Sequence, residues 1–156
     1  MAFRYQPLFS YAHKDALSEN STYQDFLDFY KQVYFTNDPL VLHVGKGRIG
    51  NVPIFKIKAP QPSILVMKEI QYHRLIEKQL IFFPDYQAIG IVRHPCAVIN
   101  SFLKTPREFK PKWDINQEWR YAPKKNSEHK ATYFGFEKWK EATYLFLELR
   151  KKYPER

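Results

Sequence analysis

The side chains best suited to bind a ligand are concentrated in residues 88–104, AIGIVRHPCAVINSFLK. The first five are apolar and predict a buried strand leading to Arg93, and Pro95 occupies the favoured first position of a helix. Open α/β sheets bind ligands beyond the carboxyl ends of their strands, where the next helix directs free N–H groups. Arg93 offers a bidentate guanidinium and Ser101 a hydroxyl, which predicts a phosphate site. The alternative is an arginine that caps a carbonyl beside an ordinary helical serine.

Another apolar run, ILVMK at residues 64–68, is typical of a buried strand. Glu69 comes directly after its last residue, Lys68, and His73 follows four residues later. Taken alone, Glu69 is an exposed carboxylate at the start of a helix, and His73 is a surface residue.

A glycine-rich segment, GKGRIG at residues 45–50, matches the pattern G-x-G-x-x-G. In a dinucleotide-binding fold the last glycines of this pattern open a helix. Here the next residues, NVPIFKIK, are typical of a strand. We therefore interpret the segment as a glycine turn that joins predicted strands at 40–44 and 52–58 into a hairpin.

The elements around these residues alternate in type. Residues 64–68 predict a strand, 72–83 a helix that ends at Pro84, 88–92 a second strand, and 95–104 a second helix. Strands and helices that alternate in this way predict α/β architecture with a parallel sheet.

Two further helices are predicted. The first runs over 21–35, with a capping box of Ser21 and Gln24 and one face of apolar residues: Tyr23, Phe26, Leu27, Tyr30 and Tyr34. The last begins after residue 132, and its inner face carries Trp139, Ala142, Leu145, Phe146 and Leu149. Between them, residues 105–132 show no sustained period, and their basic and aromatic composition predicts a long loop or lid.

Composition limits the class of protein. Lys and Arg total 25 against 16 Asp and Glu, a formal charge of +9 that attracts anionic partners. The single cysteine, Cys96, excludes an internal disulfide and a Cys-rich metal site. No apolar run is long enough to span a membrane, and the first residues do not form a signal peptide. We expect a soluble, cytoplasmic protein with no membrane partner.

The motif residues resemble the segment that binds the 3′-phosphate in sulfotransferases that use 3′-phosphoadenosine 5′-phosphosulfate. In that family a strand ends in Arg, often as V-R-D-P-R-x-V, and a Ser follows at R-x7-S spacing, as Ser101 follows Arg93. Pro95 also fits the family pattern. Two positions depart from it, because His94 stands where Asp is usual and Cys96 where Arg is usual.

The resemblance covers about residues 60–156. It implies a three-layer α/β fold with a parallel sheet, similar to the P-loop NTPase-like sulfotransferase fold, in one domain over 1–156. The family's loop that cradles the 5′-phosphosulfate has no counterpart in the sequence, so we expect an incomplete domain. Whether this chain alone is active is therefore left open.

The function that the resemblance implies is transfer of a sulfuryl group from 3′-phosphoadenosine 5′-phosphosulfate to a hydroxyl or amine, without a metal. The acceptor would be a small molecule or a glycan. Arg93 and Ser101 would hold the 3′-phosphate. Members of the family use a His or Glu as general base, so the resemblance implies that Glu69 deprotonates the acceptor, with His73 as the weaker candidate. The alternative is a non-catalytic basic module that binds nucleic acid or another polyanion, for which the charge and the loop at 105–132 would suffice.

Overall fold

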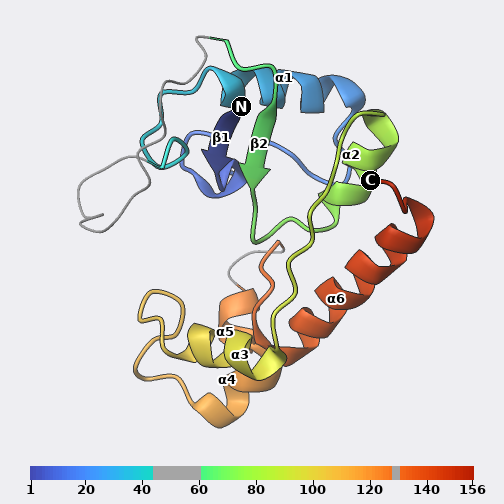
Figure 1. Ribbon diagram of the computed structural model, residues 1–156. Helices are drawn as coiled ribbons and strands as arrows, with labels where there is room; N and C mark the ends of the chain where they lie inside the picture. The colour runs from blue at the N-terminus through green and yellow to red at the C-terminus, as the bar shows by residue number, and fades with distance from the viewer. Residues whose placement is uncertain (44–60, 128–130) are drawn as a thin grey trace. The chain divides into compact units, whose positions relative to one another are not determined.

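The computed structural model describes residues 1–43, 61–127 and 131–156 (Figure 1). The chain forms two compact units, Met1–Ile70 and Gln71–Arg156. Six α-helices and a two-stranded parallel sheet in the described ranges confirm the coarse α/β class. The single domain expected over 1–156 stays a prediction, and each unit is described by itself.

The first unit contains the sheet. Strand β1 (Ala2–Tyr5) pairs in parallel with β2 (Leu65–Lys68), with Tyr5 opposite Lys68. Strand β2 confirms the strand predicted at 64–68, whereas β1 was not predicted. After β1 the chain turns at Gln6, a buried residue with a left-handed φ of 43°, into the short 3-10 helix η1 (Pro7–Phe9). The turn directs the backbone of η1 toward the end of β2.

Helix α1 (Tyr23–Tyr34) confirms the first predicted helix, but its capping box was predicted one residue too early. The Thr22 hydroxyl accepts from the Asp25 N–H, and the Asp25 carboxylate accepts from the Thr22 N–H at 2.6 Å. The Ser21 hydroxyl instead accepts from the N–H of Ser18. The buried face is also rotated from the predicted one and consists of Phe26, Phe29 and Val33.

The predicted strand at 40–44 is wrong over its described residues. Residues 40–43 form turns, because the Asp38 carboxylate accepts from the Leu40 N–H at 2.8 Å and the Asp38 carbonyl accepts from the Leu42 N–H at 2.9 Å. Asp at such a position supports turns through its own side chain. Val44, the glycine turn at 45–50 and the predicted strand at 52–58 lie outside the described residues.

The second unit is helical. Its elements are α2 (Leu75–Phe82), α3 (Pro95–Leu103), α4 (Ile115–Tyr121), α5 (Pro123–Asn126) and α6 (Gly135–Lys152). Helices α2, α3 and α6 confirm predicted helices. A core cluster of Phe102, Phe109 and Ala122 packs with Leu103, Trp113 and Phe134.

Residues 105–132, predicted to be a long loop, contain α4 and α5 in their described part. The Asp114 side chain caps α4 by accepting from the Asn116 N–H at 2.9 Å, and Ala122, with a left-handed φ of 45°, separates the two helices. Helix α6 begins at Gly135, where φ is +83° and an added Cβ would lie 2.7 Å from the Arg120 carbonyl oxygen. Only glycine fits this close crossing without strain.

The buried strand predicted at 88–92 is wrong. These residues form no strand, and the side chains of Ile89 and Ile91 are 91% and 80% exposed. The segment runs beside α6 instead (Figure 1), with Gly90 against Phe146 and the Trp139 indole N–H donating to the Arg93 carbonyl at 3.0 Å. The backbone N–H and C=O groups of a helix bond to one another, so α6 offers no hydrogen bonds with which an adjacent segment could pair as a strand.

Candidate functional site

The carboxyl end of the two-stranded sheet holds Glu69, the predicted general base. Strand β2 delivers this residue directly after Lys68, and the left-handed turn at Gln6 brings the backbone of Leu8 to it. The Leu8 N–H donates to a carboxylate oxygen of Glu69 at 3.1 Å. The Gln6 N–H donates to the Lys68 carbonyl at 2.7 Å and so extends the pairing of the strands to the turn. Glu69 is therefore positioned by the backbone of both strand ends.

The environment of Glu69 favours its protonated form. Burial raises the pKa of its carboxyl to about 7, and the hydrogen bond from Leu8 opposes this shift only in part. The donor is a neutral amide, which stabilises a carboxylate less than a cation does. A general base works best with a pKa close to the ambient pH. Glu69 is thus suited to take a proton and return it near neutral pH.

The same edge of the sheet carries a cation and stacked rings. The Lys68 ammonium lies 5.0 Å from the centroid of the Tyr5 ring. That ring stacks on the imidazole of His43, with centroids 4.3 Å apart and an interplanar angle of 16°. Because Lys68 is held by a ring and is exposed, its charge remains available to an anion at this edge.

His73, the weaker candidate base, belongs to the second unit and has the opposite property. Burial lowers the pKa of its imidazole to about 4, against a smaller opposing effect of Glu141. The ring lies 4.5 Å from the ring of Tyr133 and 5.2 Å from that of Phe146, centroid to centroid. His73 is a neutral residue packed among aromatic rings, and Glu69 is the better candidate of the two.

Arg93 and Ser101 both lie in the second unit, at α3. Arg93 comes two residues before the helix, which starts at Pro95 as predicted. Its carbonyl is anchored by Trp139, while its guanidinium is exposed and has no hydrogen-bond or ion-pair partner in the described part of the chain. The backbone of Arg93 is fixed and its charge is free for an anion.

Ser101 is the seventh of the nine residues of α3 and is exposed. It therefore lies about 9 Å along the helix axis from Pro95. Its carbonyl accepts from the Thr105 hydroxyl at 2.7 Å. One phosphate can contact both Arg93 and Ser101 only when the arginine side chain extends along the helix.

The basic residues of 105–132 are partly engaged within the protein. Lys125 pairs with Glu108 at 2.8 Å, and Arg120 pairs with Glu137 at 2.9 Å. Lys110 lies 5.4 Å from the centroid of the Trp113 ring. These contacts reduce the charge that the segment offers to a polyanion.

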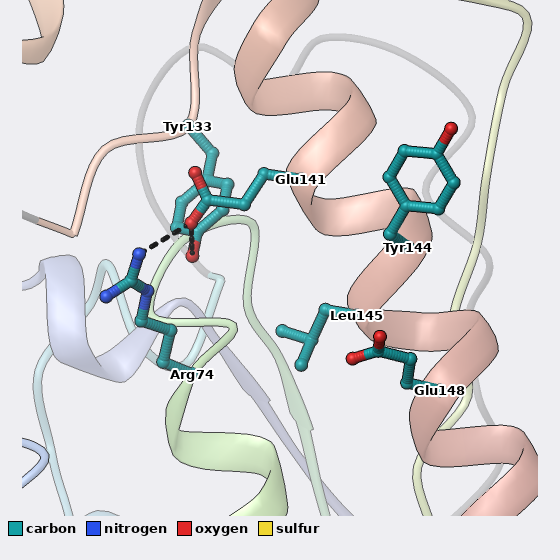
Figure 2. A pocket seen from close by; sticks show the side chains of 6 residues that line it. All are labelled: Arg74, Tyr133, Glu141, Tyr144, Leu145 and Glu148. Atoms are coloured by element: carbon teal, nitrogen blue, oxygen red, sulfur yellow. Dashed lines mark hydrogen bonds and ion pairs between the residues drawn. The ribbon is translucent and has the colours of Figure 1, made fainter.

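A polar cluster that the sequence did not predict surrounds Glu141 of α6 (Figure 2). Its carboxylate accepts from Arg74 at 2.8 Å, from Lys138 at 2.5 Å and from the Tyr133 hydroxyl at 3.1 Å. Figure 2 shows Arg74 and Tyr133 converging on Glu141 beside a hollow that Leu145 also lines. Arg74 is far from the other three residues in the sequence, and only the spacing of Lys138 and Glu141 on one helix carried a signal.

The effect of this cluster on Glu141 is the reverse of the effect at Glu69. Burial alone would raise the pKa of Glu141, but the hydrogen bonds from Lys138 and Arg74 outweigh it and hold the pKa at about 2. Glu141 stays ionised at all ordinary pH values. It organises Arg74 and Tyr133 and is not a proton carrier.

Comparison of the chain with protein-family models, with curated proteins and with solved structures finds no match. Across the described ranges, the helices lack the length and apolar character needed to cross a membrane.

Proposed function

We propose that this chain is a sulfotransferase-like protein of the P-loop-like, three-layer class, which transfers a sulfuryl group from 3′-phosphoadenosine 5′-phosphosulfate to a hydroxyl or amine. The observation that carries the proposal is Glu69, a carboxyl at the end of a parallel strand with a pKa of about 7. A base with this pKa can deprotonate an acceptor at neutral pH. The acceptor would be a small molecule or a glycan.

In the proposed reaction the Glu69 carboxylate removes the proton from the acceptor hydroxyl or amine. The acceptor oxygen or nitrogen attacks sulfur, and the bond between sulfur and the 5′-phosphate oxygen breaks in line. The products are the sulfated acceptor, 3′-phosphoadenosine 5′-phosphate and a protonated Glu69 that then releases its proton. A nearby cation would stabilise the charge on the departing oxygen.

The nucleotide half of the proposal rests on Arg93 and Ser101 with the 3′-phosphate as their ligand. The support is the anchored backbone of Arg93 at the start of α3 and its guanidinium, which has no partner among the described residues. The first N–H groups of a helix add to the attraction for an anion. Ser101 would contribute its hydroxyl from the second turn.

Titration calorimetry of 3′-phosphoadenosine 5′-phosphate against the purified chain tests this half. We expect micromolar binding that exceeds binding of adenosine 5′-monophosphate, and about a tenfold or greater loss in Arg93→Ala. Arg107→Ala is the matched control, because Arg107 is also exposed and has no partner among the described residues. Equal binding of both nucleotides, or equal losses in the two variants, would overturn the assignment of Arg93.

Sulfuryl transfer to a simple phenol tests the role of Glu69 separately. We expect Glu69→Gln to lower kcat by about 10² to 10⁴ while binding of 3′-phosphoadenosine 5′-phosphate stays unchanged. A variant that transfers at the rate of the unmodified chain would exclude Glu69 as the base. Steep salt dependence with no preference among small nucleotides would instead identify a polyanion-binding module.

A further inference from the structure

A hollow of about 480 Å³ lies in the second unit, between residues 88–92, α2 and the last turns of α6. Ala88, Gly90 and Val92 line it, whereas Ile89 and Ile91 do not and are 91% and 80% exposed; Val92 is itself 49% exposed. This alternation is the one expected for extended backbone. Two of these three residues of the segment, Ala88 and Gly90, are small, and their size leaves the hollow open.

The walls of the hollow are apolar. Leu80 comes from α2, and Phe146, Leu147 and Leu149 come from α6. The Phe146 side chain packs against Gly90. A Cβ added to this glycine would lie 3.2 Å from the ring of Phe146. The volume falls within the range of small-molecule sites, which are lined mainly by hydrophobic and aromatic side chains.

The charged side chains that line the hollow are cationic. They are Arg150 and Arg156, and among the described residues that line it none is acidic. The Arg156 guanidinium donates to the carbonyls of Tyr86, at 3.2 Å, and Phe83, both of which are neutral. The exposed Arg150 has no ion-pair partner within the described residues. Two arginines beside an apolar wall select for a ligand with an anionic head and an apolar body.

We propose that this hollow binds a small amphipathic anion, an alkyl chain that ends in a single carboxylate or sulfate group. The chain would lie against Phe146 and Leu149, and the head group would pair with Arg150. Each additional methylene buried in such a site strengthens binding by about fourfold until the hollow is full. This proposal does not depend on the proposed sulfuryl transfer.

The first test measures by calorimetry how the affinity of the unmodified protein depends on the ligand's chain length and head group. Each ligand is used below its critical micelle concentration. Hexanoate, octanoate and decanoate should bind with affinity that rises by about fourfold per methylene. Decanoate and decyl sulfate together identify which head group is preferred. Decyltrimethylammonium carries the same chain with the opposite charge, and its binding as tightly as decanoate would overturn the proposal.

The second test uses variants. Ala88→Phe fills the hollow and should abolish decanoate binding, whereas Ile89→Phe, on the exposed face of the same segment, should leave it unchanged. Arg150→Gln, at an exposed position, should weaken binding of decanoate by about tenfold and binding of decanol hardly at all. Thermal unfolding checks that each variant is folded. Decanoate binding that is indifferent to both Ala88→Phe and Arg150→Gln would place the ligand elsewhere and refute the site.

Discussion

Glu69 and Glu141 are two partly buried carboxylates, one in each compact unit, and their surroundings give them opposite properties. Glu69 accepts from the amide of Leu8, and its pKa is raised to about 7. Glu141 accepts from two cations and a tyrosine, and its pKa is lowered to about 2. Burial opposes ionisation in both, so the nature of the donors decides the outcome.

This contrast separates a buried carboxylate with a structural role from one that is a candidate for chemistry. A carboxylate satisfied by Arg and Lys has fixed charge and fixed geometry, which makes it a structural anchor. A carboxylate with a neutral donor can change its protonation state near neutral pH and is a functional candidate. The end of the sheet thus carries the candidate acid–base group, and the cluster on α6 is a structural anchor.

The largest difference is expected between the pKa values of the Glu69 and Glu141 carboxyls. A titration followed by carboxyl-carbon NMR should show Glu69 changing protonation near pH 7 and Glu141 near pH 2. The resonances can be assigned with the Glu69→Gln and Glu141→Gln variants. If both carboxyls titrate between pH 4 and 5, the contrast between the two environments does not exist.

Glu141→Gln should lower the free energy of unfolding by about 2 kcal/mol at pH 7, because Arg74 and Lys138 lose their shared anion. The folded-state pKa lies below the unfolded value. The stabilisation is therefore present above about pH 4.5 and is lost as the pH falls through about 2. Urea unfolding at pH 7 and pH 2.5 measures this change. Glu148→Gln, on an exposed residue of the same helix, is the control and should stay within about 0.5 kcal/mol.

Glu69→Gln should instead raise the free energy of unfolding at neutral pH. The folded-state pKa of Glu69 lies above the unfolded value, so its contribution is fully present below about pH 4.5 and is lost as the pH rises through about 7. The neutral amide avoids this loss. Relative to the unmodified chain, the variant should gain roughly 1 to 2 kcal/mol between pH 5 and pH 8, after allowance for solvent screening. A constant difference across this range would show that the pKa of Glu69 is not raised.

The sequence predicted the elements that depend on local signals. The strand at 64–68, the helix start at Pro95 and the stop before Pro84 follow from apolar runs and from the geometry of proline. The capping box was predicted one residue early because Ser21 and Thr22 are adjacent hydroxyl residues. Only the Asp25 carboxylate, which reaches Thr22, distinguishes between them.

Features that depend on distant neighbours were not predictable. Residues 88–92 have the composition of a buried strand, but a strand needs a partner and this segment lies along α6. The position of Glu69 after a strand was visible, whereas its raised pKa depends on burial that the sequence does not show. The Glu141 cluster joins Arg74 and Tyr133, which are 59 positions apart, and no local pattern connects them.

The smallest difference in stability is expected between two ion pairs, each formed by a lysine and a carboxylate three residues apart on one helix. Lys138 pairs with Glu141 at 2.5 Å within the cluster, and Lys31 pairs with Asp28 at 3.9 Å on the exposed surface of α1. Lys138→Met should cost about 0.5 to 1 kcal/mol and Lys31→Met almost nothing, because exposed pairs are weak and screened by salt. Urea unfolding at low and high salt measures both. Equal costs would mean that the geometry around Glu141 adds nothing to an ordinary surface pair, and the cluster would then lose its role as an anchor.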